Sequence, residues 1–424
     1  MATTLRLGHY DQGSEPDSWR EYIRRYHESP MRSDAFRGDR NGQWHGPSAV
    51  RGGQVAKLQE NLKRVGCMPK GDIDGRFGYR TQAAVRLLQA YARYHGNIAQ
   101  DEAADGVVGP KTRGLLAQAL SDGETCRWTR RAQSKSRPWP ELITDAQSHV
   151  DQQYQRAQPE LLEDGSDTVP PPDWRSARVP VHVFALRRTS WAASLDGAGR
   201  RLNNDVFVVS INGRDMYFFG STDPDPARSS NSGGAPFLVK GQHRYRFGFH
   251  RLTGNGVKCY RALRPASNGV RVVRDTDGDR SLSAGDRLDP RPNPTINFHW
   301  SGRGTSNWSA GCQVIAGAAF LDDNGEPVDC WDHAAIRYDD LGSGRDRGAY
   351  DLMMSWITVC SPDITTGGRL PLTLLEERDL DALAPDLRDA ARAAFGRAAR
   401  TVAQRDRRLQ ALLAERAPEL LISA

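Results

Sequence analysis

The segment Thr295-Ile-Asn-Phe-His-Trp-Ser-Gly-Arg-Gly-Thr-Ser-Asn-Trp-Ser-Ala-Gly-Cys-Gln-Val-Ile315 decides how the second half of this chain is interpreted. Ile296 and Phe298 alternate with polar positions and lead into His299, and Cys312 leads into a second apolar run. This pattern predicts a strand, a loop rich in Gly and Ser, and a second strand. Such a loop would bring an imidazole and a thiol to the same end of a sheet.

A thiol is a weak nucleophile until a neighbouring base or cation favours its thiolate, so this pairing points to nucleophilic chemistry. Gly311 has no side chain and would leave room for a carbonyl group near the backbone N–H groups around Cys312, as an oxyanion site requires. A free cysteine that only packs in the core is the structural alternative.

The residue order in this segment also resembles a known signature. His299-Trp, a glycine-containing gap and Ser309-Ala-Gly-Cys312 resemble the active-site pattern of the YkuD-type L,D-transpeptidases. In that β-rich family a cysteine attacks the L,D-peptide bond before the terminal D-alanine of a peptidoglycan stem and forms a thioester. The resemblance implies Cys312 as nucleophile, His299 as base, Ser309 and Gly311 as residues that shape the turn, and Trp300 as the residue whose backbone orients the imidazole.

The segment departs from the family pattern at several positions. Ala310 stands where the family has a histidine, and Gln313 stands where an arginine commonly follows the cysteine. The gap between His299 and the cysteine is also shorter than in the family. The resemblance therefore implies a divergent branch, in which Trp308 and Arg303 either line the acceptor side or pack the loop.

Two related octets, Asp74-Gly-Arg-Phe-Gly-Tyr-Arg-Thr81 and Asp105-Gly-Val-Val-Gly-Pro-Lys-Thr112, form an internal repeat. In each, Asp and two glycines predict a tight turn, and Thr predicts a cap for the helix that follows. The region from about Gly52 to Leu120 resembles the small three-helix peptidoglycan-binding domain found beside many wall enzymes. Asp74 and Asp105 would either contact the ligand or only fix the turns.

An Asp-rich loop begins at Asp275. Its oxygen-bearing side chains have the spacing of an EF-hand calcium loop and look closest to the dockerin-type variant, although Arg280 occupies the position of the turn glycine. We expect a structural calcium ion and no cofactor for catalysis; the alternative is a hairpin tip that solvates its own charges. The predicted ligands are Asp275, Asp277, Asp279, Ser281 and Asp286.

Net charge of +6, a pI of about 9.0 and a mean hydropathy of −0.64 describe a polar, basic chain. No nucleic-acid motif, long apolar run or basic-then-apolar signal peptide is visible. We therefore expect peptidoglycan stem peptides and glycan as partners, without nucleic acid or a membrane span. Synthesis in the cytoplasm and action in the periplasm or at a cell wall would require non-Sec export, through secretion or lysis machinery.

The predicted fold is multidomain α+β. Its parts are a polar N-terminal arm at 1–48, a three-helix peptidoglycan-binding domain at 49–122, a Pro-containing linker at 123–178, a β-rich L,D-transpeptidase-like domain at 179–365 and a helical C-terminal extension at 366–424. Within them we predict a hairpin at 205–219 around Asn212-Gly213, one strand at 235–250, a final strand at 353–359, and two helices after Leu370.

The function predicted from the sequence is a peptidoglycan-modifying cysteine enzyme. Its thioester would pass to a second stem amine, as in an L,D-transpeptidase, or to water, as in an L,D-carboxypeptidase. One alternative is a cell-wall-binding protein with a degenerate catalytic domain. Another is a phage lysis enzyme or interbacterial effector with the same fold.

Overall fold

The computed structural model describes most of the chain. The described residues are 3–14, 48–132, 141–142, 144–150, 165–170, 174, 179–188, 202–225, 233–250, 260–278, 285–303, 307–341, 344–361, 363–390, 392–393, 396–397, 400, 404 and 407. The segment 17–26, whose sequence could form one short amphipathic helix, lies outside them. Among the described helices, none combines the length and the apolar character needed to cross a membrane.

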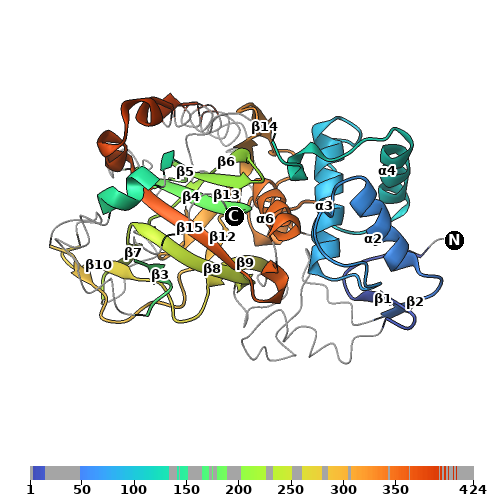
Figure 1. The fold of residues 1–424 in the computed structure, drawn as a ribbon, viewed down its shortest axis with the longest axis horizontal. Coiled ribbons are helices and arrows are strands. Elements are labelled where there is room, and N and C mark those ends of the chain that lie inside the picture. The colour runs from blue at the N-terminus through green and yellow to red at the C-terminus, as the bar shows by residue number, and fades with distance from the viewer. Residues whose placement is uncertain are drawn as a thin grey trace, which may run out of the picture.

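The β-rich part is a sheet that closes on itself into a barrel (Figure 1). The ring follows the order β12-β9-β8-β15-β4-β5-β6-β13 and closes where β12 pairs with β13. Its strands are β4 (Val181–Arg187), β5 (Asp205–Ile211), β6 (Arg214–Ser221), β8 (Gly241–His250), β9 (Tyr260–Pro265), β12 (Phe298–Trp300), β13 (Gln313–Leu321) and β15 (Arg369–Glu376). Two short strands extend it: β14 (Pro327–Asp329) beside β13, and β3 (Thr168–Val169) beside β8.

The β5–β6 hairpin confirms the prediction at Asn212-Gly213. Both residues have positive φ, 48° and 92°, as a two-residue hairpin turn requires. The segment 235–250 is not one strand, which corrects our prediction. It splits into β7 (Ala235–Leu238), which pairs with β10 (Val272–Asp275), and β8 of the barrel. A third strand, β11 (Arg287–Leu288), completes the small sheet beside the barrel.

Helices α2 (Gln54–Arg64), α3 (Tyr79–Tyr94) and α4 (Pro110–Ser121) form a helical unit at one end of the molecule (Figure 1). Strand β1 (His9–Asp11) pairs with β2 (Ser48–Val50), and the carboxylate of Asp11 accepts hydrogen bonds from the first turn of α2. The predicted N-terminal arm is therefore wrong for its first residues, because they cap and cover this unit.

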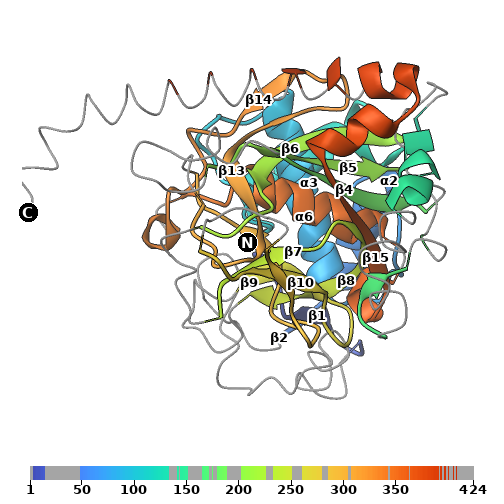
Figure 2. The same cartoon turned by 90° about the vertical axis from the view of Figure 1, so that its left-hand side faces the viewer.

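The strand predicted at 353–359 is wrong, because Ala349–Cys360 form helix α6, every residue of which is buried. An apolar run of this length does not distinguish a buried strand from a buried helix. Helix α6 lies between α3 and the strands in Figure 1, and Figure 2 shows both helices behind the barrel. It needs apolar residues on all sides because it is covered on all sides.

The prediction of two helices after Leu370 is wrong for the first residues of that segment, which form strand β15 (Arg369–Glu376). Leu370, Leu372 and Leu374 alternate along β15, which lies between β8 and β4 in the barrel, and a short 3₁₀ helix (Glu377–Ala382) follows it. A domain boundary between 365 and 366 would therefore separate a central strand from its barrel.

Part of the segment predicted as a linker, within the residues that the structure describes, packs into the molecule. Trp128 is fully buried in the 3₁₀ helix Arg127–Thr129, and its carbonyl accepts a hydrogen bond of 2.9 Å from Nε1 of Trp356 on α6. One apolar cluster contains residues of the helical unit, α6 and the barrel. The helical unit is packed directly on the barrel, so the tether that the sequence suggested between them is corrected.

Candidate active site

The candidate site forms where β12 and β13 run parallel. Phe298 pairs with Gln313, and His299 pairs with Val314. One residue earlier in this register, Cys312 lies beside Asn297, whose N–H is 3.3 Å from Sγ of Cys312. Strand alternation puts Asn297 and His299 on the same face. The structure thus brings the thiol and the imidazole to neighbouring strands, two residues apart in register.

The Cys312 thiol is held by backbone atoms. It accepts the hydrogen bond from Asn297 and donates one of 3.3 Å to the carbonyl oxygen of Thr295. Burial raises the pKa of Cys312, and the Asn297 N–H, Ser309 and the charge of Arg264 offset only part of that rise. The sulfur therefore carries its proton at neutral pH unless a base removes it.

The His299 ring is oriented by the residue that follows it. Its Nδ1 lies 2.8 Å from the carbonyl oxygen of Trp300. A carbonyl only accepts, so Nδ1 carries the hydrogen and Nε2 is the basic nitrogen of the neutral ring. The Tyr260 hydroxyl donates to the same carbonyl at 3.3 Å, and the His250 ring stacks on His299 with centroids 3.9 Å apart. Burial raises the pKa of Tyr260 well above its usual value, which keeps this phenol neutral.

The turn before Cys312 is built on Ser309. The Ser309 Oγ accepts hydrogen bonds from the N–H groups of Cys312, at 2.7 Å, and of Gly311, at 3.3 Å. Gly311 has φ of 150°, and a Cβ there would collide with Pro236 on β7. The missing side chain of Gly311 therefore admits Pro236, and the N–H groups of Gly311 and Cys312 both donate to Ser309 Oγ. A role of these N–H groups in stabilising an oxyanion stays a prediction.

The two residues predicted on the acceptor side belong to the packing of this corner. The Arg303 guanidinium lies 4.1 Å from the ring centroid of Trp331 and donates to the Trp331 carbonyl oxygen at 2.5 Å. Trp308 is half-buried, with its ring centroid 6.4 Å from that of Trp300. A role of either in substrate binding stays a prediction.

Asp74 and Asp105 occupy matching turns. Oδ1 of Asp74 accepts hydrogen bonds from Nε2 of Gln59, at 2.8 Å, and from the N–H of Arg76, at 2.9 Å. Oδ1 of Asp105 accepts from Nε2 of Gln89, at 2.9 Å, and from the N–H of Val107, at 2.8 Å. These contacts support the turn-fixing interpretation, and the two glutamines are members of the repeat that the octets alone did not reveal.

The Asp-rich loop brings three of its carboxylates together. Ligand oxygens of Asp275, Asp277 and Asp286 all lie within 4.8 Å of one another, while Asp279 and Ser281 lie outside the described residues. The loop joins β10 to β11, so strands flank it in place of the helices of an EF-hand. Clustered carboxylate oxygens are the donors that calcium prefers, so the described residues fit such an ion.

The sequence patterns did not point to Asn297 or Tyr260, and they offered His250 only as an alternative base or an ordinary strand-edge residue. Asn297 contributes its backbone N–H, and no side-chain pattern in the sequence marks such a contact. Tyr260 and His250 reach the site through the pairing of β8 with β9, which no local pattern encodes.

Three comparisons with known proteins add to this geometry. Residues 51–116 match the family model of a peptidoglycan binding domain, which confirms that part of the prediction. No curated protein matches the chain. One solved structure is a fused Zn-dependent amidase/peptidase/peptidoglycan-binding domain-containing protein from Clostridium acetobutylicum; it aligns at 16% identity over 62% of this chain and 86% of that chain, with a TM-score of 0.21. A score this low carries no argument about the fold.

The helical unit is thus a peptidoglycan-binding domain, and it indicates peptidoglycan as a partner and a location related to the cell wall.

Proposed function

We propose that this chain is a peptidoglycan-modifying cysteine enzyme of the L,D-transpeptidase type, with Cys312 as nucleophile and His299 as base. The observation that carries the proposal is the Nδ1 contact of His299 with the Trp300 carbonyl, which makes Nε2 the basic nitrogen. His299 lies on β12, next to β13, and β13 begins one residue after Cys312. The peptidoglycan-binding domain on the same core supports the choice of substrate.

In the proposed reaction, Nε2 of His299 takes the proton from Sγ of Cys312, and the thiolate attacks the carbonyl carbon of the L,D-peptide bond. The tetrahedral intermediate collapses by breaking the C–N bond, and the leaving amine takes the proton from His299. A thioester on Cys312 remains. A stem amine or water then attacks it, gives its proton to His299, and releases the thiolate with a cross-link or a trimmed stem.

The oxyanion needs a donor in this scheme. We propose the Gly311 N–H, because its contact with Ser309 is the longer of the two that Ser309 accepts, 3.3 Å against 2.7 Å. The Gly311 N–H would break its hydrogen bond to Ser309 when the substrate binds, and it would then donate to the substrate carbonyl oxygen.

The test is to incubate the full chain with purified sacculi or tetrapeptide muropeptides and to measure the products by mass. We expect loss of D-alanine or new cross-links with the wild type and neither with Cys312→Ala. Cys67→Ala, a buried cysteine of the peptidoglycan-binding domain, is the matched control and should retain activity. Identical products from the wild type and Cys312→Ala would exclude thiol catalysis at this position.

A second candidate function is wall binding with a degenerate catalytic domain. The engagement of both N–H groups by Ser309 and the position of Pro236 against Gly311 favour it. It predicts no product from any variant, together with retention of the chain on sacculi. Delivery as a phage lysis enzyme or an interbacterial effector would use the same chemistry and change only the cell wall attacked.

We further propose that the carboxylates of Asp275, Asp277 and Asp286 hold a structural calcium ion. The ion would brace the β10–β11 loop, which lies in the same small sheet as Pro236 on β7. No step of the proposed reaction uses it.

A further inference from the structure

Two buried cysteines meet where the peptidoglycan-binding domain continues into the segment that joins it to the barrel. Cys67 follows α2, and Cys126 precedes the 3₁₀ helix Arg127–Thr129. Their side chains are 1% and 2% exposed, and both are free thiols. Both also line the same small cavity, of about 20 Å³, beside α3 and α4. The two thiols therefore share one buried space, although the residues lie far apart in the chain.

Backbone contacts hold the two segments against each other. The N–H of Cys126 donates a hydrogen bond of 2.8 Å to the carbonyl oxygen of Val65, and Oγ1 of Thr129 donates one of 2.6 Å to the carbonyl oxygen of Gly66. Gly66 has φ of 75°, and a Cβ there would lie 3.5 Å from backbone atoms of Cys126. Because these contacts fix both segments, the two cysteines stay adjacent in the folded protein.

The two thiols also contact each other. The hydrogen bond with the Cys126 thiol raises the pKa of Cys67 well above its usual value, and burial raises it further. A third buried cysteine, Cys360 on α6, has its pKa raised mainly by burial, and Cys126 adds a charge effect without a hydrogen bond. Direct contact thus favours Cys67 over Cys360 as the partner of Cys126.

We propose that Cys67 and Cys126 form a structural disulfide when the protein folds outside the cytoplasm. The peptidoglycan-binding domain indicates a location related to the cell wall, and disulfides persist in such compartments. Thiols with a raised pKa react slowly, so the bond would form during folding, before the pair is buried. The proposal does not depend on chemistry at Cys312.

The bond requires a disulfide oxidant, such as oxidised glutathione. The thiolate of one cysteine attacks a sulfur of the oxidant and expels one thiolate, which leaves a mixed disulfide. The thiolate of the second cysteine attacks the protein sulfur of that mixed disulfide and expels the other thiolate. The two cysteines are oxidised, the oxidant takes their two electrons, and the two cysteine protons end on the released thiols.

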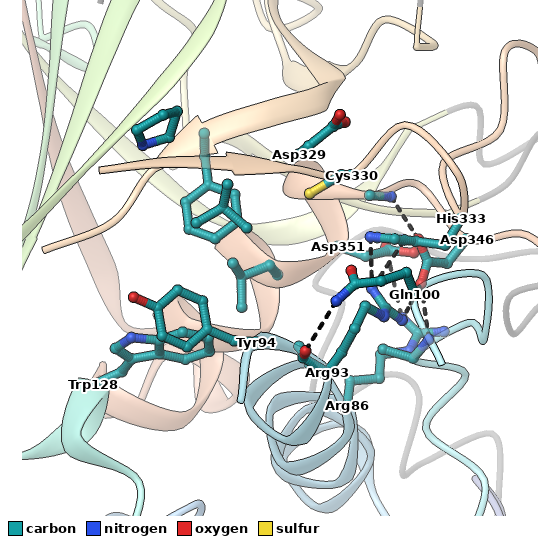
Figure 3. Close-up of a pocket in the computed structure, with 17 residues that line it drawn as sticks. Arg86, Arg93, Tyr94, Gln100, Trp128, Asp329, Cys330, His333, Asp346 and Asp351 are labelled. Atoms are coloured by element: carbon teal, nitrogen blue, oxygen red, sulfur yellow. Dashed lines mark hydrogen bonds and ion pairs between the residues drawn. The ribbon is translucent and has the colours of Figure 1, made fainter. Parts of the chain in front are cut away.

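The disulfide would fix the junction between the peptidoglycan-binding domain and the barrel. Trp128, two residues after Cys126, has its ring centroid 5.4 Å from that of Tyr94 on α3, and its carbonyl accepts from Trp356 on α6. Figure 3 shows Trp128 and Tyr94 together at the wall of the cavity between the two domains. The bond would also close the chain from Cys67 to Cys126, which contains α3 and α4, and a closed loop of this length restricts the unfolded state.

The test compares the full chain made in bacterial cells with an oxidising cytoplasm and in ordinary cells. Both preparations are alkylated in denaturant, digested without reduction and measured by mass. In the oxidised preparation we expect the Cys67 and Cys126 peptides to be linked, two hydrogens lighter than their sum, and Cys312 to be alkylated; ordinary cells should give no link. Alkylation of both Cys67 and Cys126 in the oxidised preparation, or a bond from either to Cys360, would overturn the proposal.

Thermal melting measures the effect of the bond. The oxidised preparation should melt about 5–10 °C above the reduced one, because the cross-link restricts the unfolded chain. In Cys67→Ala and in Cys126→Ala the two preparations should melt alike, and comparing each variant with itself separates the bond from the cost of the substitution. Cys330→Ala, at a buried thiol on the interdomain cavity in Figure 3, is the matched control and should keep the difference. A difference that persists in Cys67→Ala would refute the role of this pair.

Discussion

The turns of the peptidoglycan-binding domain and the Cys312 corner of the barrel are both built from short motifs with Asp, Ser, Thr and Gly, yet they use their polar groups differently. In the domain, Nε2 of Gln59 donates to Asp74, Thr81 and the Arg76 carbonyl, and its Oε1 accepts from Gly75. These hydrogen bonds use the polar groups of the turn to stabilise its conformation. In the barrel corner, backbone atoms position the Cys312 thiol and Nδ1 of His299, the two side chains to which the proposal assigns chemistry. The contrast teaches that the sequence of such a motif does not separate a structural turn from a candidate site. The hydrogen-bond partners of its polar groups do.

The comparison would be sharpened most by His299→Gln. If Nε2 is the base, kcat/KM should fall about 100-fold or more while the melting temperature stays near that of the wild type, because general-base catalysis contributes factors of this size. Muropeptide turnover and thermal melting measure the two effects. A variant with full activity would show that the ring has no part in proton transfer.

For the peptidoglycan-binding domain, the matching change is Gln59→Ala. Loss of the Gln59 amide would leave Asp74 and the Gly75 N–H without this partner, so we expect the free energy of unfolding to fall by about 2–3 kcal/mol. Denaturant melts of the full chain give the value, and Gln89→Ala in the sister turn should cost a similar amount. A large effect on kcat with no effect on stability would contradict the structural role of this turn.

The pH dependence of the reaction should reflect the raised pKa of Cys312. A thiol with a raised pKa is less ionised at neutral pH, so activity should increase as pH rises through the neutral range. In His299→Gln the rise should approach about tenfold per pH unit, because the thiolate must form without a base. Activity that falls between neutral and alkaline pH would contradict this ionisation order.

The smallest effect is expected from calcium. Chelation with EGTA should lower the melting temperature by a few degrees, roughly 1 kcal/mol for a domain of this size, with little direct effect on catalysis. Asp277→Asn should melt like the chelated wild type and should not respond to EGTA. An unchanged melting curve on chelation would contradict a structural calcium ion at this loop.

Acid should weaken the barrel independently of the site. Burial lowers the pKa of His182 and of His243 to about 3 in the folded state, against 6.5 for an exposed histidine. Between these values the unfolded chain binds more protons than the folded one, so stability falls as pH drops from about 6.5 towards 3. His182→Gln should flatten that slope. An equally steep acid transition in this variant would show that the buried His182 does not cause the loss of stability.

The sequence allowed much of the fold to be predicted wherever local chemistry decides it. The hairpin at Asn212-Gly213 follows from the need for positive φ, and the peptidoglycan-binding domain follows from its repeated turns. Helix α6 and strand β15 were missed because their character depends on what covers them, and periodicity does not report that. Arg86 and Arg93 on α3 have the sequence of a solvated helix face, but the barrel buries them.

Of the candidate site, the sequence placed Cys312 and His299 in one segment and named Trp300 as the residue that follows the base. It could not show that Pro236 fills the space at Gly311 or that His250 stacks on the imidazole, since both contacts join residues far apart in the chain.

The most direct test is the trapping of the acyl-enzyme. Full-length protein mixed with a tetrapeptide muropeptide and quenched in acid should gain the mass of the muropeptide less its terminal D-alanine on the peptide that contains Cys312, and Cys312→Ala should gain none. Turnover of the muropeptide with no adduct on the wild type, or an adduct on another residue, would contradict a thioester at this sulfur.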